Sequence, residues 1–463
     1  MSRNIPLATT LSDSALARWT VLIIVATAMM MGYFVNDVMS PLESLLELPC
    51  SEGGLGWTQA DYGFFSGASG FINVFLLMLF FSGIILDKMG IRFTGVLSCS
   101  LMVLGTLIKY YAVSAGLSGS LTVAGSHLPL SAAVASLGFA IFGVGYEMTG
   151  ITVSKAMVRW FTRHELALAM GIQLAMARLG TAAALSVSAP IARHFSLSAP
   201  LLLSLGLLIT GLLAYLVFCV MDRRLDSDEA SGCASASSAS SASDEQFRWS
   251  DIVVTLRSPG FWVITLFCVL FYSAVSPFLK FSTRLMVLKY GVDADIAGMF
   301  SSIAPFGTIL LTPFFGHVYD RYGRGVSIII TGALMLSAVH FCFALPLPEA
   351  LLSGSALIMP SAIAIALMVV FSVGYSLAPA ALWPSVPKII PMKCLGTAYS
   401  MIFFIQNFGR TIIPMFVGRA NETDPTYTTS MLIFGFTALG AAAVASVMLV
   451  IDRRNGYGLQ RRQ

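Results

Sequence analysis

Two ionisable residues stand out because each lies inside a long apolar segment. Glu147 belongs to FGVGYEMTGITVSKAMVRWF (142–161), and Arg178 belongs to ELALAMGIQLAMARLGT (165–181). Each segment is long and apolar enough to be a membrane-spanning helix, and a short polar turn joins them. At about 1.5 Å per helical residue, both charged groups would lie about 22–24 Å from that turn, at nearly the same depth. Such residues indicate a functional site, because an ionisable group inside a membrane is costly.

A carboxylate and a guanidinium at one depth could serve two purposes. They could bind the charged ends of a small zwitterion, since arginine holds a carboxylate through two parallel hydrogen bonds and glutamate accepts from an ammonium. Alternatively, Glu147 and Arg178 could simply neutralise each other. Both roles are compatible if the ion pair opens when substrate arrives. We favour substrate binding, because ionisable residues within a membrane generally serve a function.

The composition indicates that these segments do lie in a lipid bilayer. Of the 463 residues, 57% are hydrophobic and only 11% are charged, and the mean hydropathy is +0.82. A soluble chain of this length would need many more charged residues to cover its surface. The net charge of +4 is small, and the basic residues form no cluster, so nucleic-acid binding is not expected.

Bound metals, cofactors and catalysis are not expected. The seven cysteines are scattered without a CxxC or a Cys/His cluster, and the five histidines show no metal-ligand spacing. The sequence contains no recognisable cofactor-binding loop and no nucleophile–base pair. We therefore predict no cofactor, no metal site, no catalytic residues and no enzymatic activity.

Twelve apolar segments reach the roughly 20 residues that a membrane-spanning helix requires. They cover approximately 18–40, 60–86, 91–117, 131–160, 165–192, 197–221, 259–283, 293–319, 325–346, 357–386, 394–418 and 428–451. A Ser/Ala-rich stretch with the composition of a flexible linker separates the first six from the last six. The predicted fold is an all-α integral membrane protein: an N-terminal six-helix bundle (1–225), a flexible cytoplasmic linker (226–249) and a C-terminal six-helix bundle (250–463).

The basic residues predict how the chain lies in the membrane. Most lysines and arginines outside the spans fall on the side that also holds both chain ends, and few fall in the opposite loops. Both termini are therefore expected in the cytoplasm, because cytoplasmic loops are enriched in lysine and arginine. The chain begins with a polar stretch and then runs into a full-length span, so we expect no cleavable signal peptide.

Two short loops half a chain apart repeat one pattern. GIILDKMGIRFTG (83–95) follows the second span, and GHVYDRYGRG (316–325) follows the eighth. Both contain G-x-x-x-D-[RK]-x-G with an arginine shortly after it. Glycine permits a tight turn, and the acid and base can pair with neighbouring helix ends to hold an inner gate closed. The predicted gating residues are Asp87, Arg92, Asp320 and Arg324.

The twelve spans in two halves and the repeated loop pattern resemble the major facilitator superfamily over nearly the whole chain. This resemblance implies two six-helix bundles related by a pseudo-twofold axis along the membrane normal. It also implies a central substrate cavity and alternating access by rocking of the two halves.

Several stretches resemble a narrower branch, the major facilitator superfamily domain-containing protein 1 family of lysosomal dipeptide uniporters. They are 142–161, 165–181, GYSLAPAALWPSVPKIIPMKCLGTAYSMIFFIQNFG (374–409) and, more weakly, GYFVND (32–37). In that family an acid of the fourth helix and an arginine of the fifth bind the two charged ends of a dipeptide. The matching positions here are Glu147 and Arg178.

The chain also departs from the animal members of that branch. It has a longer loop at 41–59, a Ser/Ala-rich linker, and Arg410 at a position where an apolar residue is expected. Its N-terminal tail contains no acidic dileucine sorting signal, so a lysosomal location is not expected. A plasma (inner) membrane of prokaryotic type is the predicted location.

Further polar residues inside the spans complete the predicted binding site. Asp37 could assist the ammonium, carry a proton or be an ordinary satisfied polar residue. Arg410 lies close to the position symmetric to Arg178 and could provide a second carboxylate contact. Lys280 could be a cavity charge or reach the outer membrane surface. The predicted substrate-binding set is Glu147, Arg178, Asp37, Tyr375, Trp383, Gln406, Asn407 and Arg410, where packing is the alternative role for the aromatic and amide members.

The leading hypothesis is a transporter of short peptides, with dipeptides foremost, that works by alternating access as a facilitator, or uniporter. One alternative is a proton-coupled symporter or antiporter of other small organic solutes, because a buried acid could titrate. Another is a non-transporting sensor or scaffold on a transporter fold. The expected partners are a dipeptide or similar small zwitterionic solute, the lipid bilayer and, in the coupled alternative, protons. A monomer is expected, and the sequence does not exclude an accessory subunit.

Overall fold

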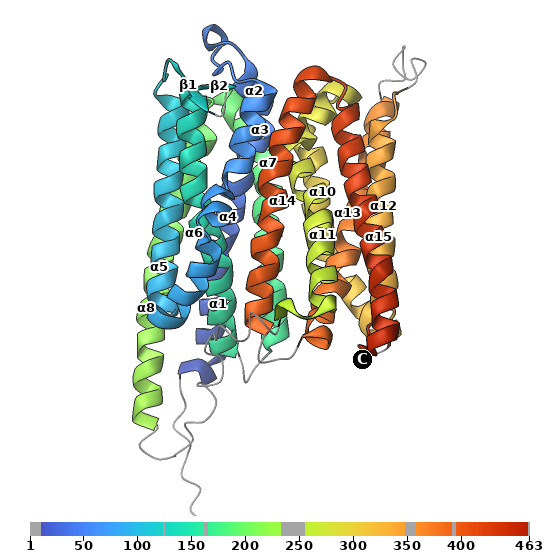
Figure 1. Ribbon diagram of the computed structural model, residues 1–463. Coiled ribbons are helices and arrows are strands. Elements are labelled where there is room, and N and C mark those ends of the chain that lie inside the picture. Colours follow the sequence, from blue (N-terminus) through green and yellow to red (C-terminus); the bar gives the residue numbers. More distant parts are fainter. Residues whose placement is uncertain are drawn as a thin grey trace, which may run out of the picture.

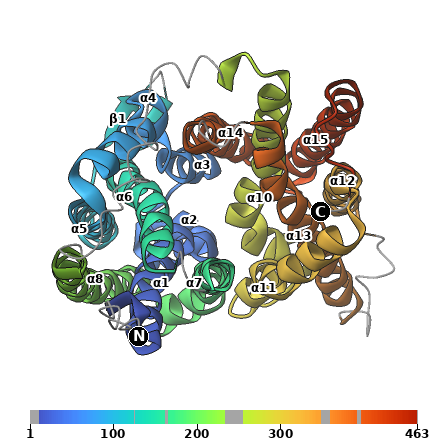
Figure 2. The ribbon, with the colours of Figure 1, turned by 90° about the horizontal axis from the view of Figure 1, so that it is seen from below.

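The structure, a computed structural model, describes residues 11–123, 126–161, 165–232, 255–347, 358–390 and 395–461. The long helices run side by side (Figure 1). A two-stranded hairpin, β1 (Ser120–Val123) with β2 (Ser126–Pro129), lies at one end of the bundle. The first and last described residues lie at the opposite end (Figure 1 and Figure 2). We refer to these as the hairpin end and the termini end.

The helices divide into two halves, which Figure 2 shows on either side of the molecule. The first half contains α1 (Ala15–Asp37), α2 (Glu43–Glu47), α3 (Gln59–Ala68), α4 (Phe71–Phe75), α5 (Met78–Ser114), α6 (Leu130–Phe161), α7 (Leu166–His194) and α8 (Ala199–Gly232). The second contains α10 (Pro259–Tyr290), α11 (Ala297–Tyr322), α12 (Gly325–Ala344), α13 (Ile358–Ile389), α14 (Leu395–Thr423) and α15 (Thr428–Asn455). Short 3-10 turns cover Leu11–Asp13, Ser40–Leu42 and Cys50–Glu52.

The predicted all-α membrane architecture is confirmed. Among the described residues, eleven helices are long and apolar enough to cross a membrane, compared with the twelve spans predicted. The difference arises at the predicted span 60–86, which is divided among α3, α4 and the start of α5. Its backbone departs from helical geometry at Leu77, where φ is 53°. The amide of Asn73 in α4 donates to the Gly143 carbonyl of α6 at 3.0 Å, so the broken segment packs against the bundle.

The repeated loop pattern corresponds to two sharp backbone turns. Gly90 lies within the bounds of α5, but its φ of 76° and ψ of 172° are not helical and mark a kink between the second and third predicted spans. Its counterpart Gly323 ends α11 with φ 69°. Both conformations strongly favour glycine, which explains why the two glycines recur. The linker is only partly described: α8 extends to Gly232, so 226–232 is helical, and the rest of the predicted linker lies outside the described residues.

The two halves are joined most closely toward the hairpin end, where α3 packs against α14 and α7 against α11. A side chain at Gly63 of α3 would meet the Pro414 carbonyl oxygen of α14 at 2.5 Å. Small residues therefore allow this close helix contact. Ion pairs reinforce it, including Arg193 with Asp295 at 3.1 Å and Arg284 with Glu47.

At the termini end the ion pairs stay within a half. Asp87 pairs with Lys155 at 2.6 Å, and Arg92 pairs with Asp226 at 2.6 Å, all within the first half. In the second half, Asp320 and Arg324 are exposed. Within the described part of the chain, no ion pair joins the two halves at this end. The gating role of the four predicted residues stays a prediction.

Candidate functional site

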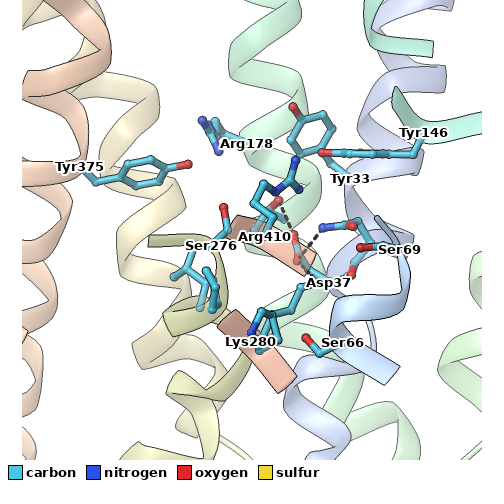
Figure 3. A pocket seen from close by; sticks show the side chains of 15 residues that line it. Tyr33, Asp37, Ser66, Ser69, Tyr146, Arg178, Ser276, Lys280, Tyr375 and Arg410 are labelled. Atoms are coloured by element: carbon cyan, nitrogen blue, oxygen red, sulfur yellow. Dashed lines mark hydrogen bonds and ion pairs between the residues drawn. The ribbon is translucent and has the colours of Figure 1, made fainter. Parts of the chain in front are cut away.

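A cavity of about 60 Å³ lies between the two halves. Residues of α1, α3, α6 and α7 line it from the first half, and residues of α10, α13 and α14 line it from the second (Figure 3). Its charged lining residues are Asp37, Arg178, Lys280 and Arg410. Four of the predicted binding residues, Asp37, Arg178, Tyr375 and Arg410, are thus brought to one cavity, together with Lys280.

Asp37 ties the two halves together at one side of the cavity. It is the last residue of α1, and its carboxylate lies 2.7 Å from the Lys280 ammonium of α10. The Thr181 hydroxyl of α7 donates to the same carboxylate at 2.8 Å. Lys280 also donates to the backbone carbonyl of Asn36, in the last turn of α1, where carbonyls have no helical partner. Lys280 is therefore a cavity charge and the ionic partner of Asp37.

Glu147 pairs with an arginine of the other half. Arg410 of α14 donates from Nη1 to Oε1 of Glu147 in α6 at 3.0 Å. The side chains are only 23% and 17% exposed, respectively. Arg410 lines the cavity, whereas Glu147 is not among its lining residues. The predicted carboxylate thus reaches the cavity only through its partner.

The alternative pairing of Glu147 with Arg178 is not formed. Although α6 and α7 are consecutive, α6 packs chiefly against α5, whereas α7 packs chiefly against α1 and α11. Consequently, equal depth in two neighbouring segments does not bring the two side chains into contact. Arg410 reaches Glu147 because α14 faces the first half across the cavity.

Arg178 is held by an aromatic ring. Its guanidinium carbon lies 4.9 Å from the ring centroid of Tyr375, which is only 3% exposed. A cation over an aromatic face is attracted to the ring quadrupole, but the ring does not neutralise its charge. Among the described residues, Arg178 has no acidic partner, unlike Lys280 and Arg410. The arrangement therefore favours an incoming anion at Arg178.

The three remaining predicted site residues lie outside the cavity lining. Trp383 packs against Phe403, with ring centroids 5.2 Å apart. The Asn407 amide donates to the Phe403 carbonyl at 2.9 Å, and Gln406 is buried. Trp383 thus packs on a ring of its own half, and the Asn407 amide bonds to the backbone of its own helix. The binding role of all three residues stays a prediction.

Two tyrosines at the cavity were missed from the sequence. Tyr33 and Tyr146 line it and contact each other, with ring centroids 5.0 Å apart. The sequence does contain a signal for them: Tyr33 lies one helical turn before Asp37, so both residues share a helix face, and Tyr146 immediately precedes Glu147. Three serines, Ser66, Ser69 and Ser276, also line the cavity without a comparable signal.

A second missed feature is a lysine with no exposed surface. Lys109 of α5 is 0% exposed, and its ammonium donates to the Val35 carbonyl of α1 at 3.3 Å. It also lies 4.6 Å from the ring centroid of Phe139 and 4.7 Å from that of Phe142. The last turn of α1 therefore holds two lysines, because its free carbonyls and Asp37 concentrate negative charge there.

The polar groups of the site suit the binding of a charged organic solute. Within the part of the chain that the structure describes, no cluster of three or more His, Cys, Asp or Glu side chains could hold a metal ion. Two ion pairs that cross between the halves, together with one cation lacking an acid among the described residues, offer a charged molecule groups of both signs with which to pair.

Comparison with known proteins identifies the group to which this fold belongs. The sequence profile described as the Major Facilitator Superfamily matches residues 109–414. The "Lysosomal dipeptide transporter MFSD1" of Bos taurus is 24% identical over 344 residues, which cover 71% of this chain and 68% of that protein. The protein of the same name from Danio rerio is 25% identical over 391 residues, covering 81% and 76%.

Solved structures share the fold at low sequence identity. A D-xylose-proton symporter superposes with a TM-score of 0.69 at 13% identity, covering 92% of this chain and 97% of that chain. A peptide transporter in complex with alafosfalin gives a TM-score of 0.66 at 16% identity, covering 98% of each chain.

The ion pair between Asp37 and Lys280 predicts a characteristic pattern of stabilities. Lys280→Met should cost about 3 kcal/mol of unfolding free energy, because it leaves a buried carboxylate without its cation. The double variant Asp37→Asn/Lys280→Met should be more stable than Lys280→Met alone, since neither charge then remains unpaired. Thermal unfolding of the purified variants, followed by intrinsic fluorescence, measures both effects.

The matched control is Lys388→Met at the termini end, where the lysine donates to the Tyr319 hydroxyl and contacts no carboxylate among the described residues. Its melting temperature should remain near that of the unaltered protein. Strictly additive losses for Asp37→Asn and Lys280→Met would contradict the ion pair.

Proposed function

We propose, since the chain belongs to the Major Facilitator Superfamily, that it is a membrane transporter of short peptides and that dipeptides are its main substrates. The predicted fold and the resemblance to the dipeptide-transporter branch are confirmed. The chain is therefore a multi-pass membrane protein of a transporter family and not an enzyme.

The observation that carries the proposal is the uncompensated guanidinium at the cavity. Arg178 rests on the ring of Tyr375 and has no acidic partner among the described residues. A peptide carboxylate would neutralise it and form two parallel hydrogen bonds, which a guanidinium provides and an ammonium does not. The names of the relatives, dipeptide transporters, favour a peptide as the source of that carboxylate.

Glu147 is the proposed acceptor for the peptide ammonium. Before a peptide binds, its carboxylate holds Arg410 instead. An arriving ammonium would replace the Arg410 guanidinium, so Glu147 would keep a cationic partner before and after binding. Asp37 remains tied to Lys280, and we assign this pair to holding the halves together rather than to direct peptide contact.

The distribution of contacts between the halves supports alternating access. Ion pairs cross between the halves at the hairpin end and beside the cavity. At the termini end, the ion pairs within the described part of the chain stay inside the first half. We infer a conformation closed at the hairpin end. Opening there would require the crossing pairs to break, and the loop residues Asp87, Arg92, Asp320 and Arg324 would then close the other end.

The charge distribution supports an orientation with both termini in the cytoplasm, because basic residues concentrate on their side. The hairpin end would then face outward. The relatives are named as lysosomal, and we propose a plasma membrane for this chain. Two bundles, 1–225 and 250–463, joined through 226–249 in a monomer, remain the proposed organisation.

Transport without an obligatory ion is the proposed mode. Each acid at the site, Asp37 and Glu147, already has a cationic partner. Neither acid needs a proton to be neutralised, and a zwitterionic substrate brings one charge of each sign. The cycle can therefore proceed as uniport down the gradient of the peptide.

Peptide binding should depend on Arg178. The dipeptide Ala-Ala at 100 times its Kd should stabilise the purified protein by about 2.7 kcal/mol, which appears as a raised melting temperature. Arg178→Gln should abolish this shift, because the peptide carboxylate then loses the guanidinium that binds it. Arg223→Gln, which removes an exposed arginine of α8, should retain it. An undiminished melting-temperature shift in Arg178→Gln would contradict the assignment of Arg178 as the group that binds the peptide carboxylate.

Uniport predicts that a pH gradient is not required. Proteoliposomes should equilibrate a labelled dipeptide at equal internal and external pH, and an imposed pH gradient should not drive accumulation above equilibrium. Proteoliposomes containing Arg178→Gln provide the matched background. Accumulation that follows the pH gradient would replace uniport with the proton-coupled alternative.

A further inference from the structure

Asp37 and Lys280 neutralise each other, and the other charged residues at the site include more bases than acids. What remains is one acid, Glu147, and two bases, Arg178 and Arg410. Both arginines line the cavity, and Figure 3 shows them reaching in from α7 and α14. Glu147 satisfies Arg410, whereas Arg178 rests on the ring of Tyr375.

The two arginines occupy nearly equivalent positions in the two halves. The repeated loops relate Asp87 to Asp320, and the same offset carries Arg178 to within one residue of Arg410. The internal repeat therefore supplies each half with one guanidinium at the cavity. A guanidinium recognises a planar carboxylate, so the cavity contains two carboxylate-binding groups that face it from opposite halves.

Peptide binding would free the second of these groups. An ammonium that occupies Glu147 displaces the guanidinium of Arg410, which is 23% exposed and has no other described carboxylate in contact. If the side chains of the peptide are neutral, Arg410 is left at a largely buried site without an anion. That situation is costly, and a basic side chain on the peptide would add to the cost.

An acidic side chain removes the imbalance. The peptide ammonium then pairs with Glu147, its terminal carboxylate with Arg178 and its side-chain carboxylate with Arg410. Every charge of site and substrate has a partner, and the peptide contacts both halves. A peptide with one net negative charge matches the one net positive charge of Glu147, Arg178 and Arg410 taken together.

We infer that this transporter selects acidic dipeptides and that Arg410 determines this specificity. This inference rests on the proposed function of peptide transport. Arg178 provides the general affinity for a peptide carboxylate, and Arg410 distinguishes among side chains. Glu147 serves as the counter-ion that holds Arg410 before binding and releases it when the ammonium arrives.

The test compares Ala-Glu with Ala-Gln, which has the same shape without the charge, and with Ala-Lys. Calorimetric titration of the full-length purified protein should give a Kd for Ala-Glu about 10-fold lower than for Ala-Gln, because a charge-assisted hydrogen bond to Arg410 is gained. Ala-Lys should bind more weakly than Ala-Gln. This comparison requires no variant, so it does not depend on the folding of an altered protein.

Variants then assign the preference to Arg410. Arg410→Gln should bring the Kd values of Ala-Glu and Ala-Gln within about 2-fold of each other, while Arg410→Lys should retain part of the difference because it keeps the charge. Arg223→Gln, which changes the net charge equally on the exposed surface of α8, should keep the full difference.

The outcomes separate the two proposals. Equal Kd values for Ala-Glu and Ala-Gln in the unaltered protein would overturn the acidic preference and leave peptide transport standing. An undiminished preference in Arg410→Gln would overturn the role of Arg410. If none of the three peptides binds while another solute does, peptide transport and the acidic preference both fail.

Discussion

The pairing of charge within a low-dielectric interior is the constraint on which the rest of the structure depends. Five charged side chains, Asp37, Glu147, Arg178, Lys280 and Arg410, lie where the two halves face each other, and burial makes each unpaired charge expensive. Asp37 with Lys280 and Glu147 with Arg410 meet this constraint by reaching across the interface. Arg178 meets it only in part, through the ring of Tyr375. The site is therefore complete only when an anion arrives.

The same pairs connect binding with conformational change. Because each crossing pair has one partner in each half, separating the halves on that side would strand buried charges. Lys109 is also fully buried, but it stays within the first half, where it bonds to the Val35 carbonyl in the last turn of α1. A bound peptide can substitute for part of the pairing, so occupancy and the position of the halves become linked. Small residues such as Gly63 allow the tight helix contact toward the hairpin end that accompanies this state.

Much of the fold could be predicted from the sequence, because membrane-spanning helices and the positions of ionisable residues within them are local properties. The broken second segment was not foreseen, since Leu77 takes an unusual backbone conformation under the packing of α4 against α6. Glu147 and Arg178 were visible as charges in apolar helices. The partner of Glu147 could not be predicted, because Arg410 belongs to α14, which faces Glu147 from the other half and is distant in the sequence. Trp383, Gln406 and Asn407 looked similar to cavity residues because polarity and aromaticity do not reveal which helix face is packed.

The central claim is that Arg178 binds the carboxylate of a peptide. Calorimetric titration of the unaltered protein with Ala-Ala and with its C-terminal amide, Ala-Ala-NH₂, tests this claim most directly, because the two ligands differ only in that group. The account predicts that the amide binds about 100-fold more weakly, since a largely buried arginine would lose a hydrogen-bonded anion. Equal Kd values for the acid and the amide would contradict it.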